Sequence, residues 1–464
     1  MGYIMYEINF SNPANAYFIG IGGISMSGFA ELLHETGFRV SGSDARESKI
    51  TRHLESLGMN IIYGQSAANI TDDIDFIVYT AAIHPDNPEY RAAVEKGIPM
   101  MERAKMVGQV MKNYPNSIAV SGTHGKTTTT SMISHILLTA GMDPTISVGG
   151  ILPAIGGNIR IGKSGNFLTE ACEYTNSFLK FHPTAGIILN VEEDHLDFFK
   201  DLEDIRNSFA RFAQLLPEDG VLIINEEITD YDQLTGDLPC QVLTYGIDSD
   251  TAAFSAREIS YDGQGCGSFT LFVNGEPSGK YNLSVPGQHN VSNALAAIAL
   301  ATHYQISPEQ IKSGLADFKG TERRFQYKGD LHGVTIIDDY AHHPTEIAAT
   351  LESAKRYPHN HLWCVFQPHT YTRTKAFLKE FAQALSEADN IILAPIYAAR
   401  EKDPGDISSE NIVEELEKLG KMAYYFPTFD EIENFLLQNC SAGDLLITMG
   451  AGDVVTIGEK LLNI

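Results

Sequence analysis

The sequence predicts an α/β protein built from three successive α/β blocks, and three observations predict this class. Apolar strands alternate with helix-like segments along the whole chain, a pattern typical of mostly parallel sheets. The 464 residues exceed the roughly 250 to 300 that one hydrophobic core can serve. A first alternating series ends at about residue 114, and the apolar periodicity lapses around "ADFKGTERRFQ", residues 316–326, before a third series begins. We therefore predict domains at 1–114, 115–321 and 322–464.

Composition limits the classes of function. The net charge of −26 argues against a nucleic-acid partner, because affinity for a polyanion comes mainly from Lys and Arg. No stretch approaches the roughly 18 apolar residues that would span a bilayer, and the start of the chain has no export signal, so we expect no stable membrane association. The 5 cysteines are scattered without CxxC spacing, which favours a reducing cytoplasm.

The first block begins with a strand that runs into the glycine loop "GIGGISMSG", residues 20–28. Further strands and helices are expected at 25–37, 39–44, 74–83 and 98–112. The loop departs from the dinucleotide fingerprint GxGxxG at Ser25, although Asp44 lies at about the distance of the acid that binds a ribose. This block is therefore expected to bind a nucleotide diphosphate, and NAD is not established. The candidate substrate-binding residues are Gly22, Gly23, Ser25, Ser27, Asp44 and Thr80.

The second block opens with a strand followed by "SGTHGKTTTT", residues 121–130. Val120 stands where the Walker pattern has its first glycine, so the pattern itself fails. The physical requirements survive, because two glycines let backbone N–H groups approach an anion, a lysine supplies charge, and a helix begins behind it. The loop therefore predicts a nucleotide triphosphate site made of Gly122, Thr123, His124, Gly125, Lys126, Thr127 and Thr128.

Acidic and imidazole groups follow the next two apolar strands. "NFLTEACEY" places Glu170 and Glu173 past one strand, and "NVEEDHLD" places residues 192–195 past another. Ligands of open parallel sheets gather at these strand ends, and oxygen ligands suit Mg²⁺. We take Glu170 and His195 as candidate metal ligands.

The third block repeats the alternation, with strands expected within 334–340, 361–369, 390–397 and 444–454. Two of these strand ends carry "DDYAHHPTEI" and "FQPHTYTRT". Polar groups at strand ends of this kind favour a ligand-facing surface. The candidates are Asp339, His342, His343, His369 and Arg373.

In their order along the chain, these motifs resemble those of the Mur ligases, and the likeness extends to "GQHNVSNALAA", "RRFQ" and "GAGDV". The resemblance implies a Rossmann-like domain for the UDP end of a substrate, a central P-loop-type ATPase domain, and a Rossmann-like third domain that closes over ATP and admits an amino acid. It implies that Lys126 binds ATP phosphates, that Thr127 and Glu170 hold Mg²⁺, and that His195 lies at a second metal. The remaining implied nucleotide contacts are Asn290 and Asn293 to adenine, Arg324 to the phosphates, and Asp339 to the ribose.

Within the family, the motifs are most similar to those of members that join L-alanine to the lactyl carboxylate of UDP-N-acetylmuramate in peptidoglycan precursor synthesis. The implied route is transfer of the γ-phosphoryl group to the carboxylate, followed by attack of the amine on the acyl phosphate. The base for the amine is left open between His342 and His343, and His369 and Arg373 are expected near the amino acid. We expect a monomer or weak homodimer.

Some positions depart from the family pattern. Cys172 and Thr175 replace aspartates of several members, and we expect Cys172 to be a buried, inert thiol. Thr370 stands where some members have an arginine that holds the amino-acid carboxylate, so Arg373 or Arg400 would substitute. Three alternatives stay open: a recycling ligase that attaches a tripeptide to UDP-N-acetylmuramate, an NAD-dependent dehydrogenase, and a non-enzymatic nucleotide switch.

Overall fold

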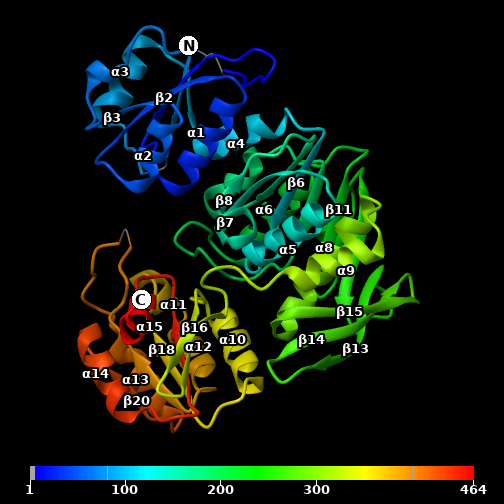
Figure 1. The fold of residues 1–464 in the computed structure, drawn as a ribbon, viewed down its shortest axis with the longest axis vertical. Coiled ribbons are helices and arrows are strands. Elements are labelled where there is room, and N and C mark those ends of the chain that lie inside the picture. Colours follow the sequence, from blue (N-terminus) through cyan, green and yellow to red (C-terminus); the bar gives the residue numbers. More distant parts are fainter. Residues whose placement is uncertain (1–5, 81, 400) are drawn as a thin grey trace.

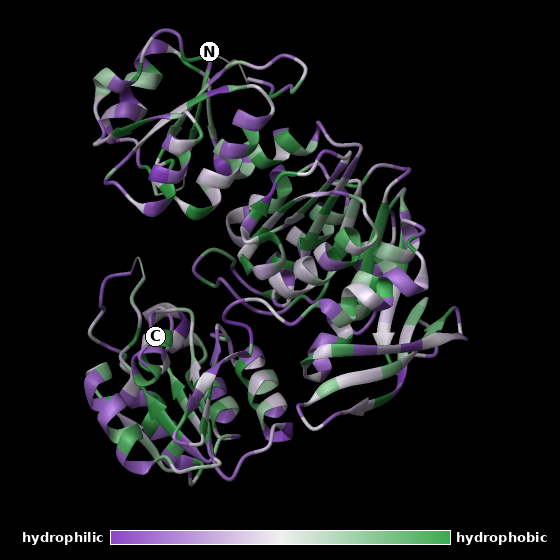
Figure 2. Ribbon diagram, viewed as in Figure 1, coloured by the Kyte–Doolittle hydropathy of each residue, from purple (hydrophilic) through white to green (hydrophobic). Residues whose placement is uncertain are grey.

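A computed structural model describes residues 6–80, 82–399 and 401–464, and it contains three separate sheets flanked by helices. In Figure 1 the N-terminal unit (blue) and the C-terminal unit (yellow to red) lie on the same side of the central unit (cyan to yellow-green). The apolar residues, green in Figure 2, concentrate along the strands and on the helix faces that cover them. The α/β class predicted from the sequence is confirmed.

The N-terminal sheet has the order β3-β2-β1-β4-β5, and its pairings are all parallel. Because the order reverses at β1, the loop after β1 lies at the crevice where open α/β sheets bind ligands. This is a Rossmann-like arrangement. Its elements are β1 (Asn15–Ile19), α1 (Ile24–Glu35), β2 (Arg39–Asp44), α2 (Lys49–Ser56), β3 (Asn60–Tyr63), η1 (Ala67–Asn69), β4 (Phe76–Tyr79), α3 (Pro88–Lys96), β5 (Met100–Glu102) and α4 (Arg103–Met111).

The central sheet has ten strands in the order β15-β14-β13-β12-β11-β10-β6-β9-β7-β8. Strands β6, β9, β10, β11 and β12 run parallel, whereas β13, β14 and β15 form antiparallel hairpins. The strands are β6 (Asn116–Ser121), β7 (Thr145–Leu152), β8 (Gly157–Arg160), β9 (Asn166–Glu170), β10 (Ala185–Ile188), β11 (Val221–Asn225), β12 (Gln241–Ile247), β13 (Phe254–Tyr261), β14 (Cys266–Val273) and β15 (Glu276–Pro286). The helices are α5 (Lys126–Thr139), η2 (Pro153–Ile155), η3 (Tyr174–Lys180), α6 (Leu202–Ala213), α7 (Asp232–Thr235), α8 (Gln288–His303) and α9 (Pro308–Asp317).

Helix α5 begins at the end of the phosphate loop because two glycines precede it and an apolar face follows. Met132, Ile133, Ile136 and Leu137 are all buried, as their spacing predicts, and Gly141 takes the left-handed φ of 70° just past the helix. The strand before the loop and the helix after it give the central unit its P-loop-type architecture.

The C-terminal sheet has the order β16-β17-β21-β18-β19-β20, parallel except for the antiparallel β16. The four predicted strands correspond to β17, β18, β19 and β21, and this unit is also Rossmann-like. Its elements are β16 (Gln326–Leu331), β17 (Val334–Asp339), α10 (Pro344–Arg356), β18 (Leu362–Phe366), α11 (Tyr371–Ala376), α12 (Leu378–Leu385), β19 (Asn390–Leu393), α13 (Ser409–Lys418), β20 (Ala423–Tyr425), α14 (Phe429–Asn439), β21 (Leu445–Met449) and α15 (Val455–Leu462). Within the part of the chain described, no helix is both long and apolar enough to cross a membrane.

Candidate active site

The phosphate loop between β6 and α5 requires its two glycines. Gly122 and Gly125 have φ of 142° and 83°, and a Cβ on Gly125 would lie 2.7 Å from Oδ1 of Asn293. Asn190, after β10, braces the loop by accepting a hydrogen bond from the N–H of His124 at 2.8 Å. The backbone N–H groups at the start of α5 therefore remain directed at the space in front of the loop, which is the arrangement that binds phosphate.

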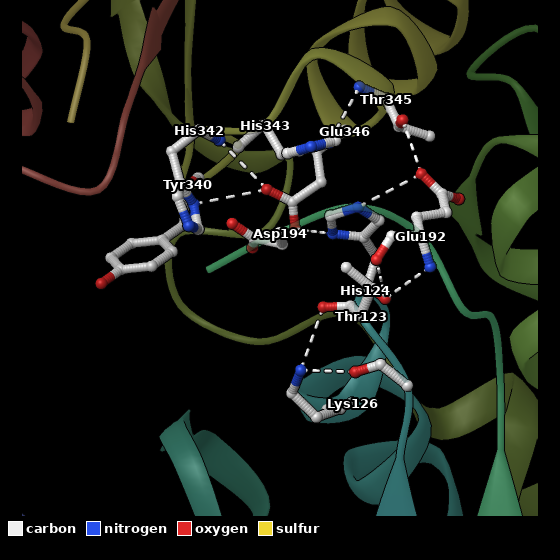
Figure 3. Close-up of polar contacts among 12 residues, drawn as sticks. Thr123, His124, Lys126, Glu192, Asp194, Tyr340, His342, His343, Thr345 and Glu346 are labelled. Carbon is white, nitrogen blue, oxygen red and sulfur yellow. Dashed lines mark hydrogen bonds and ion pairs between the residues drawn. The ribbon is translucent and has the colours of Figure 1, made fainter. Parts of the chain in front are cut away.

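Lys126 projects along this loop (Figure 3). Figure 3 shows its Nζ donating to Thr123 O, at 3.0 Å. The same Nζ donates to Oε2 of the buried Glu173 at 3.0 Å. Burial alone would lower the pKa of Lys126, but the charge of Glu173 raises it. The ammonium group is therefore a permanent cation at neutral pH.

Thr127 and Glu170 are brought together, as the metal prediction requires. The Thr127 hydroxyl donates to Glu170 Oε2 at 3.0 Å, and Glu170 Oε1 accepts from the N–H of Gly149. Burial raises the pKa of Glu170 because it removes water from the carboxylate, so a bound cation would stabilise the charged form of this side chain. These oxygen donors fit the coordination that Mg²⁺ prefers.

The neighbours of His195 differ from those of Thr127 and Glu170. It has a left-handed φ of 52°, and its Nε2 lies 3.6 Å from Glu173 Oε1 and 3.8 Å from Asp194 Oδ2. Glu173 thus links the phosphate-loop lysine to His195. Burial lowers the pKa of His195, which favours a neutral imidazole with a lone pair for a metal.

The predicted adenine and phosphate contacts line one cavity of about 610 Å³ next to the phosphate loop. Asn290 and Asn293 lie on the first turns of α8, where Asn293 Nδ2 donates to Asn290 Oδ1 at 3.2 Å. Arg324 and Asp339 reach the same cavity from the C-terminal side.

The Asp339 carboxylate already accepts two backbone hydrogen bonds, from Phe325 N–H at 2.8 Å and Ala341 N–H at 2.7 Å. These contacts anchor the segment that enters the C-terminal unit. Burial raises the pKa of Asp339 to about 6. A ribose hydroxyl would supply a further donor to this partly satisfied carboxylate.

The C-terminal unit contacts the phosphate loop through the start of α10 (Figure 3). Glu346 Oε1 lies 3.3 Å from His124 Nδ1, and the Thr345 hydroxyl donates to Glu192 Oε2 at 2.7 Å. Burial alone would lower the pKa of His124, but Glu346 and Glu192 raise it to about 9. His124 is therefore an imidazolium held between carboxylates from both units.

His342 and His343 differ in how their rings are held. His342 Nδ1 lies 3.0 Å from Tyr340 O and 3.3 Å from Glu346 Oε2, and burial lowers its pKa to about 3. His343 Nε2 lies 3.0 Å from Glu193 O, and its Nδ1 accepts from Thr345 N–H at 3.4 Å.

Arg373 and His369 lie together, with Arg373 NH1 3.2 Å from His369 Nδ1. Arg373 NH2 also donates to Asp194 Oδ1 at 2.8 Å, across the interface between the two units. Both groups of this ion pair are largely buried. Arg400, the other candidate for the amino-acid carboxylate, lies outside the described residues.

The predicted substrate-binding loop lies at the carboxyl ends of β1, β2 and β4. The N–H of Gly22 donates to Asp44 Oδ2 at 2.8 Å, so Asp44 shapes the loop, and Ser27 is turned back onto Ile24 O. Arg103, at the start of α4, donates to the Ser25 hydroxyl at 3.0 Å. The full predicted set here is Gly22, Gly23, Ser25, Ser27, Asp44 and Thr80.

The expectation of a buried Cys172 is wrong, because the residue is exposed. It lies two residues after the end of β9, and the loop there turns toward η3 with Thr175 at a left-handed φ of 55°. Its thiol pKa is raised to about 11 by desolvation from the surrounding protein and by the charge of Glu173. The thiol is therefore protonated at neutral pH.

Several functional candidates carried no clear sequence signal. Glu173 stood out only as one of several acidic residues, and Arg103, Asn190 and Glu346 were not singled out at all. Asn190 could have been predicted as a site residue from its position at the end of the apolar strand "IILN". The partners of Arg103 and Glu346 lie far away in the sequence.

The protein has three α/β units, and the central unit carries a phosphate loop. The third unit brings histidine residues to that loop. This combination is typical of an enzyme that acts on phosphate compounds. The Mur ligase catalytic-domain model matches residues 15–115, the middle-domain model 120–301 and the glutamate-ligase-domain model 323–452. The chain belongs to the Mur ligase family.

Similar proteins extend over the whole chain. The UDP-N-acetylmuramate–L-alanine ligase of Agathobacter rectalis is 60% identical over 99% of this chain and 100% of that protein. The solved structure of UDP-N-acetylmuramate-alanine ligase from Thermotoga maritima is 30% identical, with a TM-score of 0.79 over 97% of this chain and 98% of that one. A murein peptide ligase from Psychrobacter arcticus is 25% identical, with a TM-score of 0.68 over 97% and 98%.

Proposed function

We propose that this chain uses ATP to join L-alanine to the lactyl carboxylate of UDP-N-acetylmuramate, releasing ADP and phosphate. The observation that carries the proposal is the meeting of the phosphate loop with the histidine-bearing start of α10, through His124 and Glu346. This meeting places a nucleotide site against the unit expected to admit the amino acid. The 60% identity to the Agathobacter rectalis ligase supports the choice of substrates.

The roles of the three units follow the predicted boundaries. We assign UDP binding to residues 1–114, ATP binding to 115–321, and amino-acid binding with closure to 322–464. We further propose that the protein works in the cytoplasm as a monomer or weak homodimer, on small-molecule substrates.

The first step needs charge neutralisation and positioning. A carboxylate oxygen of the substrate attacks the γ-phosphorus, and the bond from that phosphorus to the ADP oxygen breaks. Lys126 and the N–H groups of the loop offset the charge on the transferring group. Thr127 and Glu170 would hold Mg²⁺, which when bound neutralises further phosphate charge, and His195 is the candidate ligand of a second ion.

The second step needs a neutral amine. The nitrogen of L-alanine attacks the carbonyl carbon of the acyl phosphate, a tetrahedral intermediate forms, and phosphate leaves. His342 and His343 are the candidate bases, because each has one ring nitrogen beside a backbone carbonyl, which leaves the lone pair on the other ring nitrogen. His369 and Arg373 are assigned to the amino-acid pocket.

The test is phosphate release from Mg-ATP and UDP-N-acetylmuramate, run with L-alanine, with the murein tripeptide and with no amino acid, with products weighed by mass spectrometry. Release that depends on L-alanine and yields UDP-N-acetylmuramoyl-alanine is expected. Release only with tripeptide would favour the recycling ligase. No release with either acceptor, while ATP still binds, would refute the substrate assignment.

A further inference from the structure

A cluster of three metal-capable side chains lies where the central and C-terminal units meet, apart from the Thr127 and Glu170 pair. His124 comes from the phosphate loop, Glu192 from the segment after β10, and His343 from the start of α10. One ligand atom from each lies within 4.8 Å of the other two. Figure 3 shows His124 between Glu192 and Glu346, with His343 beside them.

His124 directs an unsatisfied nitrogen into this cluster. Its Nε2 is buried, makes no hydrogen bond within the described residues and lies 3.5 Å from Glu192 Oε2. Its Nδ1 lies 3.3 Å from Glu346 Oε1. The contact with Glu192 is too long for a hydrogen bond and leaves this buried nitrogen poorly satisfied, so a cation that displaces the ring proton would satisfy both the nitrogen and the Glu192 carboxylate.

His343 is oriented in a complementary way. Glu193 O can only accept, so His343 Nε2, which lies 3.0 Å from it, carries the hydrogen and donates. Nδ1 then carries the lone pair of the ring. The hydrogen bond that Nδ1 accepts from Thr345 N–H is long, at 3.4 Å. Metal-bound histidines typically use one ring nitrogen for the metal and donate the other N–H to a carboxylate or a backbone carbonyl. Glu346 and Glu193 O supply these two outer partners.

We propose that His124 Nε2, His343 Nδ1 and Glu192 Oε2 form a Zn²⁺ site that joins the central and C-terminal units. Two imidazoles and one carboxylate are a ligand set that Zn²⁺ uses, whereas Mg²⁺ prefers oxygen ligands alone and competes weakly. Tetrahedral bonds of about 2.0–2.2 Å place ligand atoms about 3.4 Å apart. The 3.5 Å between His124 Nε2 and Glu192 Oε2 already matches this spacing, and a ring nitrogen of His343 lies within 4.8 Å of both atoms.

The site has a consequence for turnover, and this part rests on the proposed function. An ion bound by both units holds the C-terminal unit closed and immobilises His124, two residues from Lys126. Zn²⁺ therefore inhibits the ligase even in excess Mg²⁺. Binding of the ion, in contrast, requires no nucleotide and no substrate.

The test is titration of the metal-free, untagged full chain with Zn²⁺ by calorimetry in excess Mg²⁺, and with Co²⁺ by visible absorption. One equivalent and the intense bands of a tetrahedral Co²⁺ complex are expected. His124→Asn and Glu192→Gln should each weaken binding by at least about 100-fold, and Glu346→Gln by about 10- to 100-fold as an outer partner. His182→Asn removes an exposed histidine outside the cluster and should leave binding unchanged.

Circular dichroism of each variant verifies folding, and two independent ligand variants keep the result interpretable if one of them unfolds. Binding that is equally tight in His124→Asn and Glu192→Gln, or the absence of a stoichiometric tetrahedral Co²⁺ complex, would overturn the proposal. Because the titration contains neither ATP nor UDP-substrate, its failure is separate from failure of the ligase assay.

Discussion

Lys126 lies between two kinds of partner, the carbonyl oxygens of its own loop and the buried carboxylate of Glu173. Glu173 compensates the lysine charge while no phosphate is present. An incoming triphosphate offers stronger acceptors at the same place, so the ammonium group can exchange one anion for another without becoming unpaired.

We expect Lys126→Met to lower kcat on the order of 10²- to 10³-fold, because one charged donor to the transferring phosphoryl group is lost. Steady-state phosphate release measures the effect. Lys200→Met is the matched control, since Lys200 is 86% exposed and, among the described residues, its ammonium group pairs only with the adjacent Asp201. Equal losses in the two variants would show that the Lys126 effect is not local to the phosphate loop.

The sequence predicted residues whose neighbours are set by one loop or one strand end. Lys126 and Thr127 follow from the glycine loop, and Glu170 follows from its place at the end of β9. Glu346 could not be predicted in this way, because its partner His124 lies 222 positions earlier and meets it only when two units pack together.

At the scale of elements, α4 fixes how the N-terminal unit joins the central one. Gly108 packs against the end of η3 so closely that a Cβ at this position would lie 1.8 Å from Lys180 O. The helical pattern of α4 was visible in the sequence. The need for glycine was not, because it comes from a chain segment about 70 residues away.

Gly108→Ala should destabilise the chain by about 1–3 kcal/mol or more, because the added methyl group overpacks a backbone contact. Thermal unfolding measures the change, and Gly263→Ala is the control because nothing lies within 4 Å of a Cβ there. An unchanged melting temperature for Gly108→Ala would mean that α4 is not held at η3.

Asp444 connects β18 to the start of β21. Its Oδ2 accepts from Trp363 Nε1 at 3.0 Å and from Ser441 N–H at 2.9 Å. Burial opposes ionisation, but these hydrogen bonds lower the pKa of the carboxyl group overall. Its stabilising effect is therefore complete above the unfolded pKa near 3.9 and is lost as pH falls through the lower folded pKa.

We expect Asp444→Asn to be less stable than the parent at pH 7 and the difference to shrink as the pH approaches 3. Urea unfolding followed by tryptophan fluorescence measures this locally, because Trp363 is the only tryptophan in the chain. Asp430→Asn, at a carboxylate that is 81% exposed, is the surface control. A gap of constant size from pH 7 to pH 3 would contradict the assigned titration.

At the scale of the whole molecule, the C-terminal unit contacts each residue of the segment 192–194. Thr345 binds the Glu192 side chain, His343 the Glu193 carbonyl, and Arg373 the Asp194 side chain. The sequence pattern predicted that these groups lie at strand ends. Side chains at such positions typically face a ligand, so the sequence also predicted a role in binding. It could not predict that they also face one another, because that depends on how two independent sheets are oriented.

Asp194→Asn should shift the chain toward an open arrangement. The Asp194 and Arg373 side chains are only 7% and 10% exposed, and removing one partner of a buried pair costs about 3–5 kcal/mol because the other charge is left unpaired. Opening lets Arg373 return to water, so the chain avoids this cost by separating the two units rather than by unfolding. X-ray scattering of the ligand-free protein should then give a larger radius of gyration for the variant. Lys460→Met, which removes two ion pairs that lie entirely within the C-terminal unit, should scatter like the parent. Identical scattering from Asp194→Asn and the parent would mean that other contacts hold the units together.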